Sequence, residues 1–599
     1  MKRGLLILFG ILFLICLGSF VSAIGLTPIA RWDVVPYQRI NSGETLNLGV
    51  VAFSKEGIDR VEFLISGQGY SGGVKTATEM GLNPQTGVWE YWVPLSASEF
   101  SSDGVINVEA VVYGRDGGVR TKDTHGGGEG LDALNLSVYP SGAQPKEIWV
   151  SVTGSDSNPG TRNSPVATVG KAMKIIEIAN GGKADGGIVR LMPGNYSMNA
   201  GGYSSINTLN EWITITRDYS GTKENTIINR TGHYLERLPT TKLLKVSGVT
   251  IRGTREWVES IFYRSNLGWA DNCYVIGYDW HEGLLAERET SPVQNAQYLT
   301  NCNITNTMWG ADRALLARNL SIYHIGDDAI RQTPFVINSR VFDMQPGPDT
   351  CPNPSTNEEC WHQDCWQWVG GSTLPDGSPW VPNNAILYGF RCDTQYNSSG
   401  NLPSFWVRQN RETTPLRPPA EGIAFVNNYI ADIPGGIGWY VPGNHFLFWH
   451  NTFKGNFHFY NDFSLDGRVP LNILNFSVEG NVFQTLSFEA IIGDNIGGVP
   501  DAPGVSVFDW KNNHYMTYYV PIYSVWPGTG NTTGNPCLDS YGRPNSTSVL
   551  LNRVSPLVVP VDADGNPRDS MPDVGAYEFI SETPPTGNCE IKKAYWRIL

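Results

Sequence analysis

The stretch that decides the fold reads IWVSVTGSDSNPGTRNSPVATVGKAM over residues 148–173 and GGIVRLMPGNYSM over residues 186–198. Its β-rich parts, 148–152 and 188–192, predict two short strands. Between them a Gly-, Ser- and Asn-rich turn cluster leads to Thr168, which can N-cap a helix. The apolar residues of that helix are predicted to share one face: Ala172, Met173, Ile175, Ile176 and Ile178. This order of strand, capping helix and second strand is typical of the first coil of a solenoid.

The same stretch resembles the N-terminal signature of secreted right-handed parallel β-helix proteins of the pectate-lyase-like superfamily, which is rich in polysaccharide lyases. Near the other end, VDADGNPR (561–568) and PDVGAYEF (572–579) resemble the closing coil of surface β-helix proteins. The resemblance implies an all-β fold with one right-handed parallel β-helix over residues 147–580. It implies no single reaction, because unrelated activities share this solenoid.

The rest of the chain divides around that solenoid. With 599 residues it is too long for one ordinary domain. Short strands with turn signals over residues 25–140 predict a small β-sandwich of immunoglobulin-like type. Residues 141–146 form a linker and 581–599 a C-terminal tail. The sandwich is expected to be a spacer, and a sugar-binding platform of Trp89, Tyr91 and Trp92 is the alternative.

Residues 1–23 are predicted to be a secretory signal peptide. Lys2 and Arg3 precede an apolar run, and small residues ending at Ala23 suit cleavage. An uncleaved membrane anchor is the alternative. No other apolar run of spanning length follows, so we expect a secreted or cell-surface protein with no membrane contact after cleavage. The net charge of -14 argues against a nucleic-acid partner, because phosphate binding needs a basic surface.

Cysteine usage fits this export. Beyond Cys16 the chain has an even set of cysteines, which favours disulfides in an oxidising compartment. The set comprises Cys273, Cys302, Cys351, Cys360, Cys365, Cys392, Cys537 and Cys589. We expect Cys351–Cys360 to clip a loop. Cys273–Cys302 and Cys365–Cys392 are each separated by about one coil, so they could link neighbouring coils.

A loose repeat runs through the predicted solenoid. Asn427, Asn451 and Asn481 follow β-rich stretches at intervals of 24 and 30 residues, in the period range of solenoids. Asn tolerates a left-handed backbone and bonds to its neighbours in turns. We therefore predict a stacked ladder of asparagines at one corner.

Two polar segments mark the candidate site: HIGDDAIR (324–331) and WHQDCWQW (361–368). Asp328 and Asp364 are 36 positions apart, but the fifteen residues 346–360 look like an excursion from the coil, which leaves 21, about one coil. Since coils stack at the inter-strand distance, Asp328 should lie on Asp364 and Arg331 on Gln367.

Both segments resemble motifs of predicted carbohydrate-active β-helices, G-D-D-A-I and H-x-D-x-x-Q. Gly-Asp-Asp also occurs in polygalacturonase-type hydrolases. The other motifs of those hydrolases, N-T-D, G-H-G and R-I-K, are absent here, which argues against their mechanism.

Two chemistries fit these residues. A lyase needs a base beside a uronic carboxylate and a cation or neutral donor to stabilise the developing enolate. His324 or His362 could be that base, with Arg331 and Gln367 binding the carboxylate. A hydrolase needs two carboxyl groups, which Asp328 and Asp364, with Asp327 beside them, could supply. The remaining interpretation makes these aspartates turn caps.

Aromatic residues gather around the second segment. Aromatic faces stack on sugar rings, and concave sites are often aromatic-lined. The candidates for substrate binding are Trp361, Trp366, Trp368 and Trp439. Calcium is the cofactor that the sequence could bind. Its oxygen ligands could come from the turn with Ser155, Asp156 and Asn158, or from Asp327 and Asp364.

The sequence therefore predicts an exported protein that binds and cleaves a polysaccharide, with lyase chemistry favoured over hydrolysis. The alternative is a non-catalytic surface or adhesion protein with a structural solenoid. The sequence does not specify the sugar, the linkage or the oligomeric state.

Overall fold

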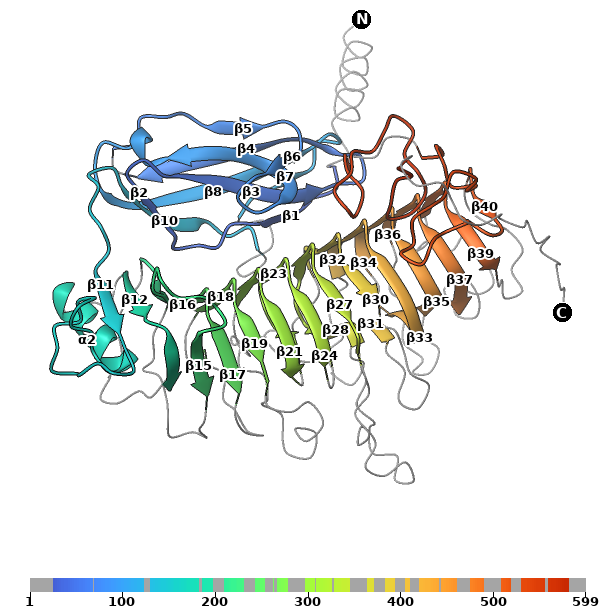
Figure 1. Cartoon of the computed structure of the whole chain (residues 1–599). Helices are drawn as coiled ribbons and strands as arrows, with labels where there is room; N and C mark the ends of the chain where they lie inside the picture. The colour runs from blue at the N-terminus through green and yellow to red at the C-terminus, as the bar shows by residue number, and fades with distance from the viewer. Residues whose placement is uncertain are drawn as a thin grey trace, which may run out of the picture.

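The structure is a computed structural model, which shows a β-sandwich followed by a parallel β-helix (Figure 1). It describes residues 25–580 except 68, 123–129, 182–185, 198–209, 231–242, 254–261, 263–266, 278–296, 308, 326–327, 345–363, 371–382, 394–403, 410–419, 441–442, 461–473, 490–507, 519–528 and 555–558. The all-β prediction and the order of the two domains are confirmed. The predicted signal peptide lies outside these residues, and within them no helix is long and apolar enough to cross a bilayer.

The sandwich consists of two sheets. One has the order β1 (Ile29–Trp32), β3 (Thr45–Phe53), β7 (Val88–Ser96) and β6 (Gly81–Asn83). The other has the order β2 (Arg39–Asn41), β10 (Leu134–Tyr139), β8 (Gly104–Gly114), β4 (Ile58–Gly67) and β5 (Lys75–Ala77), with β9 (Val119–Arg120) paired to β8. A single 3-10 turn, η1 (Ala97–Glu99), follows β7. Tyr91 is buried inside the sandwich, so it is not part of an exposed sugar-binding platform.

The first sheet of the solenoid has thirteen parallel strands in sequence order. They are β11 (Glu147–Val150), β12 (Gly187–Leu191), β14 (Ile213–Arg217), β16 (Leu243–Ser247), β18 (Leu267–Asp271), β20 (Tyr298–Thr300), β23 (Leu316–Arg318), β26 (Phe335–Ile337), β29 (Ala385–Tyr388), β32 (Ala420–Val426), β34 (Gly443–Trp449), β36 (Leu474–Glu479) and β38 (Phe508–Lys511). Each strand pairs with the one a coil later, as a solenoid requires.

The remaining solenoid strands form a second parallel sheet. It begins with β13 (Gly194–Ser197), β15 (Thr226–Arg230), β17 (Thr250–Gly253), β19 (Tyr274–Ile276) and β21 (Asn303–Thr307). In the middle coils it divides into two rows. One row is β21, β24 (Ser321–Ile325), β27 (Arg340–Phe342) and β30 (Arg391–Asp393); the other is β22 (Ala311–Asp312), β25 (Ile330–Arg331), β28 (Asp364–Gly370) and β31 (Ser404–Gln409). The last strands are β33 (Tyr429–Tyr440), β35 (Thr452–Tyr460), β37 (Val482–Glu489), β39 (His514–Tyr518) and β40 (Thr532–Thr533).

The predicted helix caps the first coil as α2 (Val169–Ala179). Thr168 is its N-cap, with the side-chain oxygen accepting a hydrogen bond from the Lys171 N–H. Ala172, Met173 and Ile176 join the solenoid core. Ile178, which was predicted to lie on the same face, is 66% exposed, so the apolar stripe is one residue narrower than expected.

The predicted asparagine ladder exists at the turn after the first sheet. The Nδ2 of Asn451 donates to Oδ1 of Asn481 at 2.9 Å, and Asn481 donates in the same way to Asn513 at 2.9 Å. Asn428 begins the ladder by donating to Asn451 at 2.9 Å. Asn427, predicted to belong to the ladder, is instead the residue before it, and the left-handed backbone occurs at this preceding position, with φ of 56° at Asn427.

Two cysteines occupy the same turn position in earlier coils. Cys273 and Cys302 are buried and reduced, so the predicted link between them is wrong. Each thiol donates to the carbonyl two residues earlier, Cys273 to Asp271 at 3.3 Å and Cys302 to Thr300 at 3.2 Å. These cysteines therefore act as small turn residues.

The second predicted inter-coil link is confirmed, because Cys365 and Cys392 form a disulfide between β28 and β30. Cys537 is also in a disulfide. The predicted pair Cys351–Cys360 lies outside the described residues.

The sandwich lies along the outer side of the first sheet (Figure 1). One hydrophobic cluster contains residues of both domains, and Phe53 packs edge-on against Tyr388 and Trp449 at 5.5 and 6.4 Å. A buried ion pair joins Asp33 to Arg318 at 2.6 Å. The linker alone therefore does not set the arrangement of the domains.

The C-terminal segment does not close the last coil as predicted. After β40 it runs back along the side of earlier coils, in the red part of Figure 1. The Ala576 N–H donates to Thr452 Oγ1 at 3.0 Å, and Tyr577 packs on Tyr429 with ring centroids 5.7 Å apart. The motif that resembles a closing coil thus covers a flank of the solenoid.

Candidate functional site

The candidate site lies where β25 and β28 run side by side on neighbouring coils. Arg331 pairs with Gln367 in the parallel register. The Ala329 N–H donates to the Asp364 carbonyl at 2.8 Å, so Asp328, one residue earlier, reaches the position beside Asp364. The predicted stacking of the two segments across a long insertion is therefore confirmed at the backbone.

Each aspartate contacts a polar side chain three residues later on its own segment. Oδ2 of Asp328 lies 3.8 Å from Nε of Arg331. Oδ2 of Asp364 accepts a hydrogen bond from Nε2 of Gln367 at 2.8 Å. The two coils thus repeat one local arrangement, in which a carboxylate orients the polar side chain three residues after it.

Burial separates these side chains into two groups. The Asp328 side chain is 2% exposed and the Arg331 side chain 29%. Asp364 is fully buried, and Gln367 is partly exposed. A large substrate would therefore meet Arg331 and Gln367 before either carboxylate.

Arg331 sits between polar and aromatic neighbours. Ile330 is buried in the solenoid core, so alternation along the strand turns Arg331 outward. Asp312 is its register partner on the preceding coil. The Arg331 guanidinium carbon lies 5.3 Å from the centroid of the Trp309 ring. An aromatic face and an acidic neighbour both help to hold a cation in place.

His324 lies at the preceding corner of the same coil, at the end of β24. Its Nε2 is 2.7 Å from Oδ2 of Asp343, and the two side chains are 38% and 39% exposed. Both residues have left-handed backbones, with φ of 52° and 51°. An imidazole held by a carboxylate keeps a fixed orientation and tautomer.

Asp343 was not predicted from the sequence. The signal was available in the local coil length, because Asn319 and Asn338 at the first turn are 19 residues apart, as are His324 and Asp343. Beside this pair the rings of Tyr323 and Phe342 stack with centroids 5.0 Å apart. Both rings are partly exposed and form an aromatic surface on the same two coils.

The tryptophans predicted to bind substrate lie in different surroundings. Trp366 is 1% exposed in the core, where its ring meets Phe425 edge-on at 5.5 Å. It therefore lines no open cleft. Trp368 lies in β28 and Trp439 in β33. Trp361, His362 and Asp327 lie outside the described residues.

The early turn considered for calcium uses its acidic oxygens within the protein. Asp156 Oδ1 accepts from the N–H groups of Ala167 and Thr168, and Oδ2 from the Thr168 hydroxyl. The carboxylate thus supports the start of α2. No cluster of three or more His, Cys, Asp or Glu side chains suited to a metal occurs in the part of the chain that the structure describes.

No protein-family model matches the sequence, and no curated protein matches it. Three solved structures align with this chain at low sequence identity. A rhamnogalacturonan lyase is 13% identical, with a TM-score of 0.31, over 61% of this chain and 87% of the other. XylC in complex with xylose is 9% identical, with a TM-score of 0.37, over 72% and 98%. The catalytic domain of a GH87 α-1,3-glucanase in complex with nigerose is 11% identical, with a TM-score of 0.24, over 82% and 90%.

Proposed function

We propose that this chain is an exported polysaccharide lyase whose reaction takes place where His324 of β24 and Arg331 of β25 reach the surface. The observation that carries the proposal is the burial pattern. The imidazole of His324 and the guanidinium of Arg331 reach the surface, while Asp328 and Asp364 do not. A polymer could therefore touch a base and a cation there.

His324 is the proposed base. With Nε2 held by Asp343, the lone pair of Nδ1 would take the proton from the carbon beside a uronic carboxylate. The electron pair of the broken C–H bond forms the new double bond, and the bond to the glycosidic oxygen breaks as this oxygen takes up a proton from water. A base of this kind contributes about 10²–10⁴-fold to the rate.

Arg331 and Gln367 are proposed to bind the uronic carboxylate. A cation beside that carboxylate stabilises the negative charge that develops as the proton leaves. The column of Asp312, Arg331 and Gln367 along neighbouring coils would align the polymer across the strands. The stacked rings of Tyr323 and Phe342 offer an apolar surface for adjacent sugars.

Hydrolysis fits less well. A two-carboxyl mechanism needs an acid in contact with the glycosidic oxygen and a second carboxylate in contact with the sugar or a water. Asp364 is fully buried, and its Oδ2 accepts a hydrogen bond from Nε2 of Gln367. These carboxylates are better placed to position Arg331 and Gln367.

The test is a screen of the purified protein on uronic-acid polymers and neutral polysaccharides. Ultraviolet absorbance of unsaturated ends and the release of reducing ends are read in parallel. We expect both signals on a uronic-acid polymer, and a loss of about 10²–10⁴-fold in His324→Ala. Asn303→Ala, an exposed change on β21, is the control.

Other outcomes decide against the proposal. Reducing ends without ultraviolet absorbance would indicate hydrolysis. Binding without either signal would favour the non-catalytic surface protein.

A further inference from the structure

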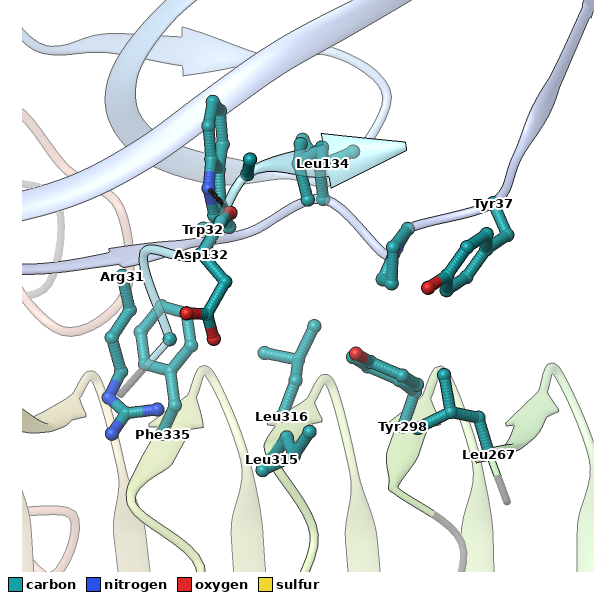
Figure 2. A pocket seen from close by; sticks show the side chains of 14 residues that line it. Arg31, Trp32, Tyr37, Asp132, Leu134, Leu267, Tyr298, Leu315, Leu316 and Phe335 are labelled. Atoms are coloured by element: carbon teal, nitrogen blue, oxygen red, sulfur yellow. Dashed lines mark hydrogen bonds between the residues drawn. The ribbon is translucent and has the colours of Figure 1, made fainter. Parts of the chain in front are cut away.

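A pocket lies at the seam between the sandwich and the first sheet of the solenoid, away from the corner that carries His324. Its volume is about 210 Å³. The sandwich contributes Trp32, Tyr37 and Leu134, and the solenoid contributes Tyr298, Leu316 and Phe335 (Figure 2). Sites for drug-sized ligands usually measure about 300–1,000 Å³, so this pocket suits one small ring.

Polar groups enter an otherwise apolar pocket at two places. Figure 2 shows the hydroxyl groups of Tyr37 and Tyr298 pointing toward its centre from one end, and the Asp132 carboxylate, Phe335 and the Arg31 guanidinium at the other. The Trp32 indole N–H donates to the backbone carbonyl of Asp132 at 2.8 Å, which holds that segment in place. Burial raises the pKa of Tyr298, with Tyr37 and Asp132 as further causes.

Tyr37 has a strained backbone. Its φ is 61°, which bulky side chains rarely adopt. The conformation is held by the Tyr37 N–H, which donates to the Asn135 carbonyl at 2.6 Å. Such strain persists where the surrounding structure enforces it and is common at binding sites. Here it places an aromatic ring at the pocket.

The pocket is close in sequence to the candidate site. Phe335 follows Arg331 by four residues, and Leu315 follows Asp312 by three. Four residues span at most about 14 Å when extended. The corner that links β25 to β26 therefore carries Arg331 on one side and a wall of the pocket on the other, a separation that a short oligosaccharide can bridge.

We propose that this seam pocket binds one neutral sugar unit. The aromatic rings of Trp32, Tyr37 and Phe335 match the apolar C–H face of a pyranose. The carboxylate of Asp132 and the two phenols match its hydroxyl groups, because a carboxylate accepts and a phenol both donates and accepts. Arg31 and Asp132 bring opposite charges to one end of the pocket, and a neutral sugar matches a lining without net charge. The pocket then serves as a distal subsite for the polymer cut at Arg331, a role that rests on the proposed function.

The experiment measures monosaccharide binding to the full chain by saturation-transfer NMR and calorimetry. The probes are the methyl glycosides of glucose, galactose, xylose and mannose, with the methyl glycoside of galacturonic acid, ionised at neutral pH, as the charged probe. We expect binding of at least one neutral glycoside, weakened about tenfold or more in Tyr298→Phe and Asp132→Ala, as loss of a buried hydrogen bond implies. Tyr298→Phe keeps the shape of the pocket, so it remains informative if Tyr37→Ala fails to fold.

Two controls separate this inference from the lyase proposal. Tyr541→Ala, at an exposed tyrosine on the C-terminal segment, should bind normally. Arg331→Gln should also bind the neutral glycoside normally even if it turns over no polymer. The inference is overturned if no neutral glycoside binds, if both pocket variants bind as well as wild type, or if the sugar acid binds more tightly than every neutral probe.

Discussion

Asp328 and Asp364 each reach a polar side chain three residues later, and this contact defines their role. A carboxylate that is 2% exposed meets no polymer, but it restricts the rotamers of the arginine beside it. His324 has the same kind of support from Asp343 on the next coil. In each case a buried or partly buried carboxylate positions the group that would touch substrate.

Replacing Asp328 should therefore reduce activity without abolishing it. In Asp328→Asn the charge 3.8 Å from Nε of Arg331 is lost, and a partly exposed ion pair is worth about 1 kcal/mol, which corresponds to about 5-fold in kcat/KM. Arg331→Gln should lose at least as much, mainly through KM on a uronic-acid polymer. Steady-state kinetics on the polymer identified by the screen measures both variants. Total inactivity of Asp328→Asn with unchanged structure would identify Asp328 as a reacting group.

The redox state of each cysteine can also be tested residue by residue. Cys273 and Cys302 are reduced and buried, while Cys365 and Cys392 are bonded. Alkylation under denaturing conditions without reductant should label the first two and spare the second two, as read by peptide mass spectrometry. Labelling before denaturation should be slow, because burial also raises the pKa of the Cys302 thiol. A recovered Cys273–Cys302 cross-link would contradict the structure.

Among the elements, the asparagine turn is the device that keeps neighbouring coils in register. Asn481 accepts from both the backbone N–H and the Nδ2 of Asn451, and its own Nδ2 donates to Asn513 and to the Phe448 carbonyl. Every polar atom of a fully buried amide is thereby satisfied.

Removing one step of this ladder should be costly. Asn481→Ala leaves the Asn451 N–H and the Phe448 carbonyl without their partner, and each buried unsatisfied group costs about 1–3 kcal/mol. We expect a loss of about 2–5 kcal/mol in the free energy of unfolding. Asn303→Ala, at an exposed asparagine outside the ladder, should stay within about 0.5 kcal/mol. Equal denaturation midpoints for the two variants would show that the ladder is not stabilising.

Periodic features of this kind could be predicted from the sequence, and features that depend on local irregularity could not. Asn451 and Asn481 recur at one coil, and removing one insertion aligned Arg331 with Gln367. Trp366 was misjudged because the register of β28 against β31 shifts between Asp364 and Trp366. Such a bulge changes which residues face the core.

Contacts between the domains are the least predictable part of the whole molecule. Asp33 and Arg318 are 285 positions apart in the chain, yet they form a buried ion pair. No motif marks such a partner, since a single charge in each of two strands carries no spacing signal. The seam nevertheless buries the outer side of the first sheet, and with it several titratable groups.

Glu90 is one of these groups. Burial raises its pKa well above the usual value, with Asp33 as a second cause. A raised carboxyl pKa means that its stabilising contribution is present at low pH and is lost as pH rises through the folded pKa. Glu90→Gln keeps an oxygen for the Asn83 amide, which donates to Glu90 at 2.7 Å. We therefore expect the difference in melting temperature between the variant and wild type to increase in favour of the variant as the pH is raised. Scanning calorimetry measures this difference. The same difference in melting temperature between the two proteins at every pH would contradict this expectation.

His445 gives the seam the opposite dependence on pH. Burial lowers its pKa from 6.5 to about 4. Its Nδ1 lies 2.9 Å from the Thr27 carbonyl, and the Lys55 N–H donates to Nε2 at 3.3 Å. The neutral ring therefore links two segments of the sandwich, the one before β1 and the one after β3, to β34 of the solenoid. A depressed pKa means that the stabilisation is complete above pH 6.5 and declines as pH falls to about 4.

The decline should amount to about 3 kcal/mol over that interval, since each unit of pKa shift is worth about 1.4 kcal/mol. His445→Asn keeps a donor for Thr27 but does not titrate, so its stability relative to wild type should rise as the solution is acidified. Hydrogen exchange at the Lys55 amide reports the seam directly, and its protection factor, the intrinsic exchange rate divided by the observed rate, should be lower in wild type at pH 4.5 than at pH 7. His514, whose pKa is also lowered to about 4 but which bonds within the last coils, provides the matched control. His514→Asn should alter the global acid sensitivity while leaving the pH dependence at Lys55 intact. If Lys55 responds equally to both substitutions, the acid response belongs to the solenoid as a whole, and His445 is not what couples the sandwich to it.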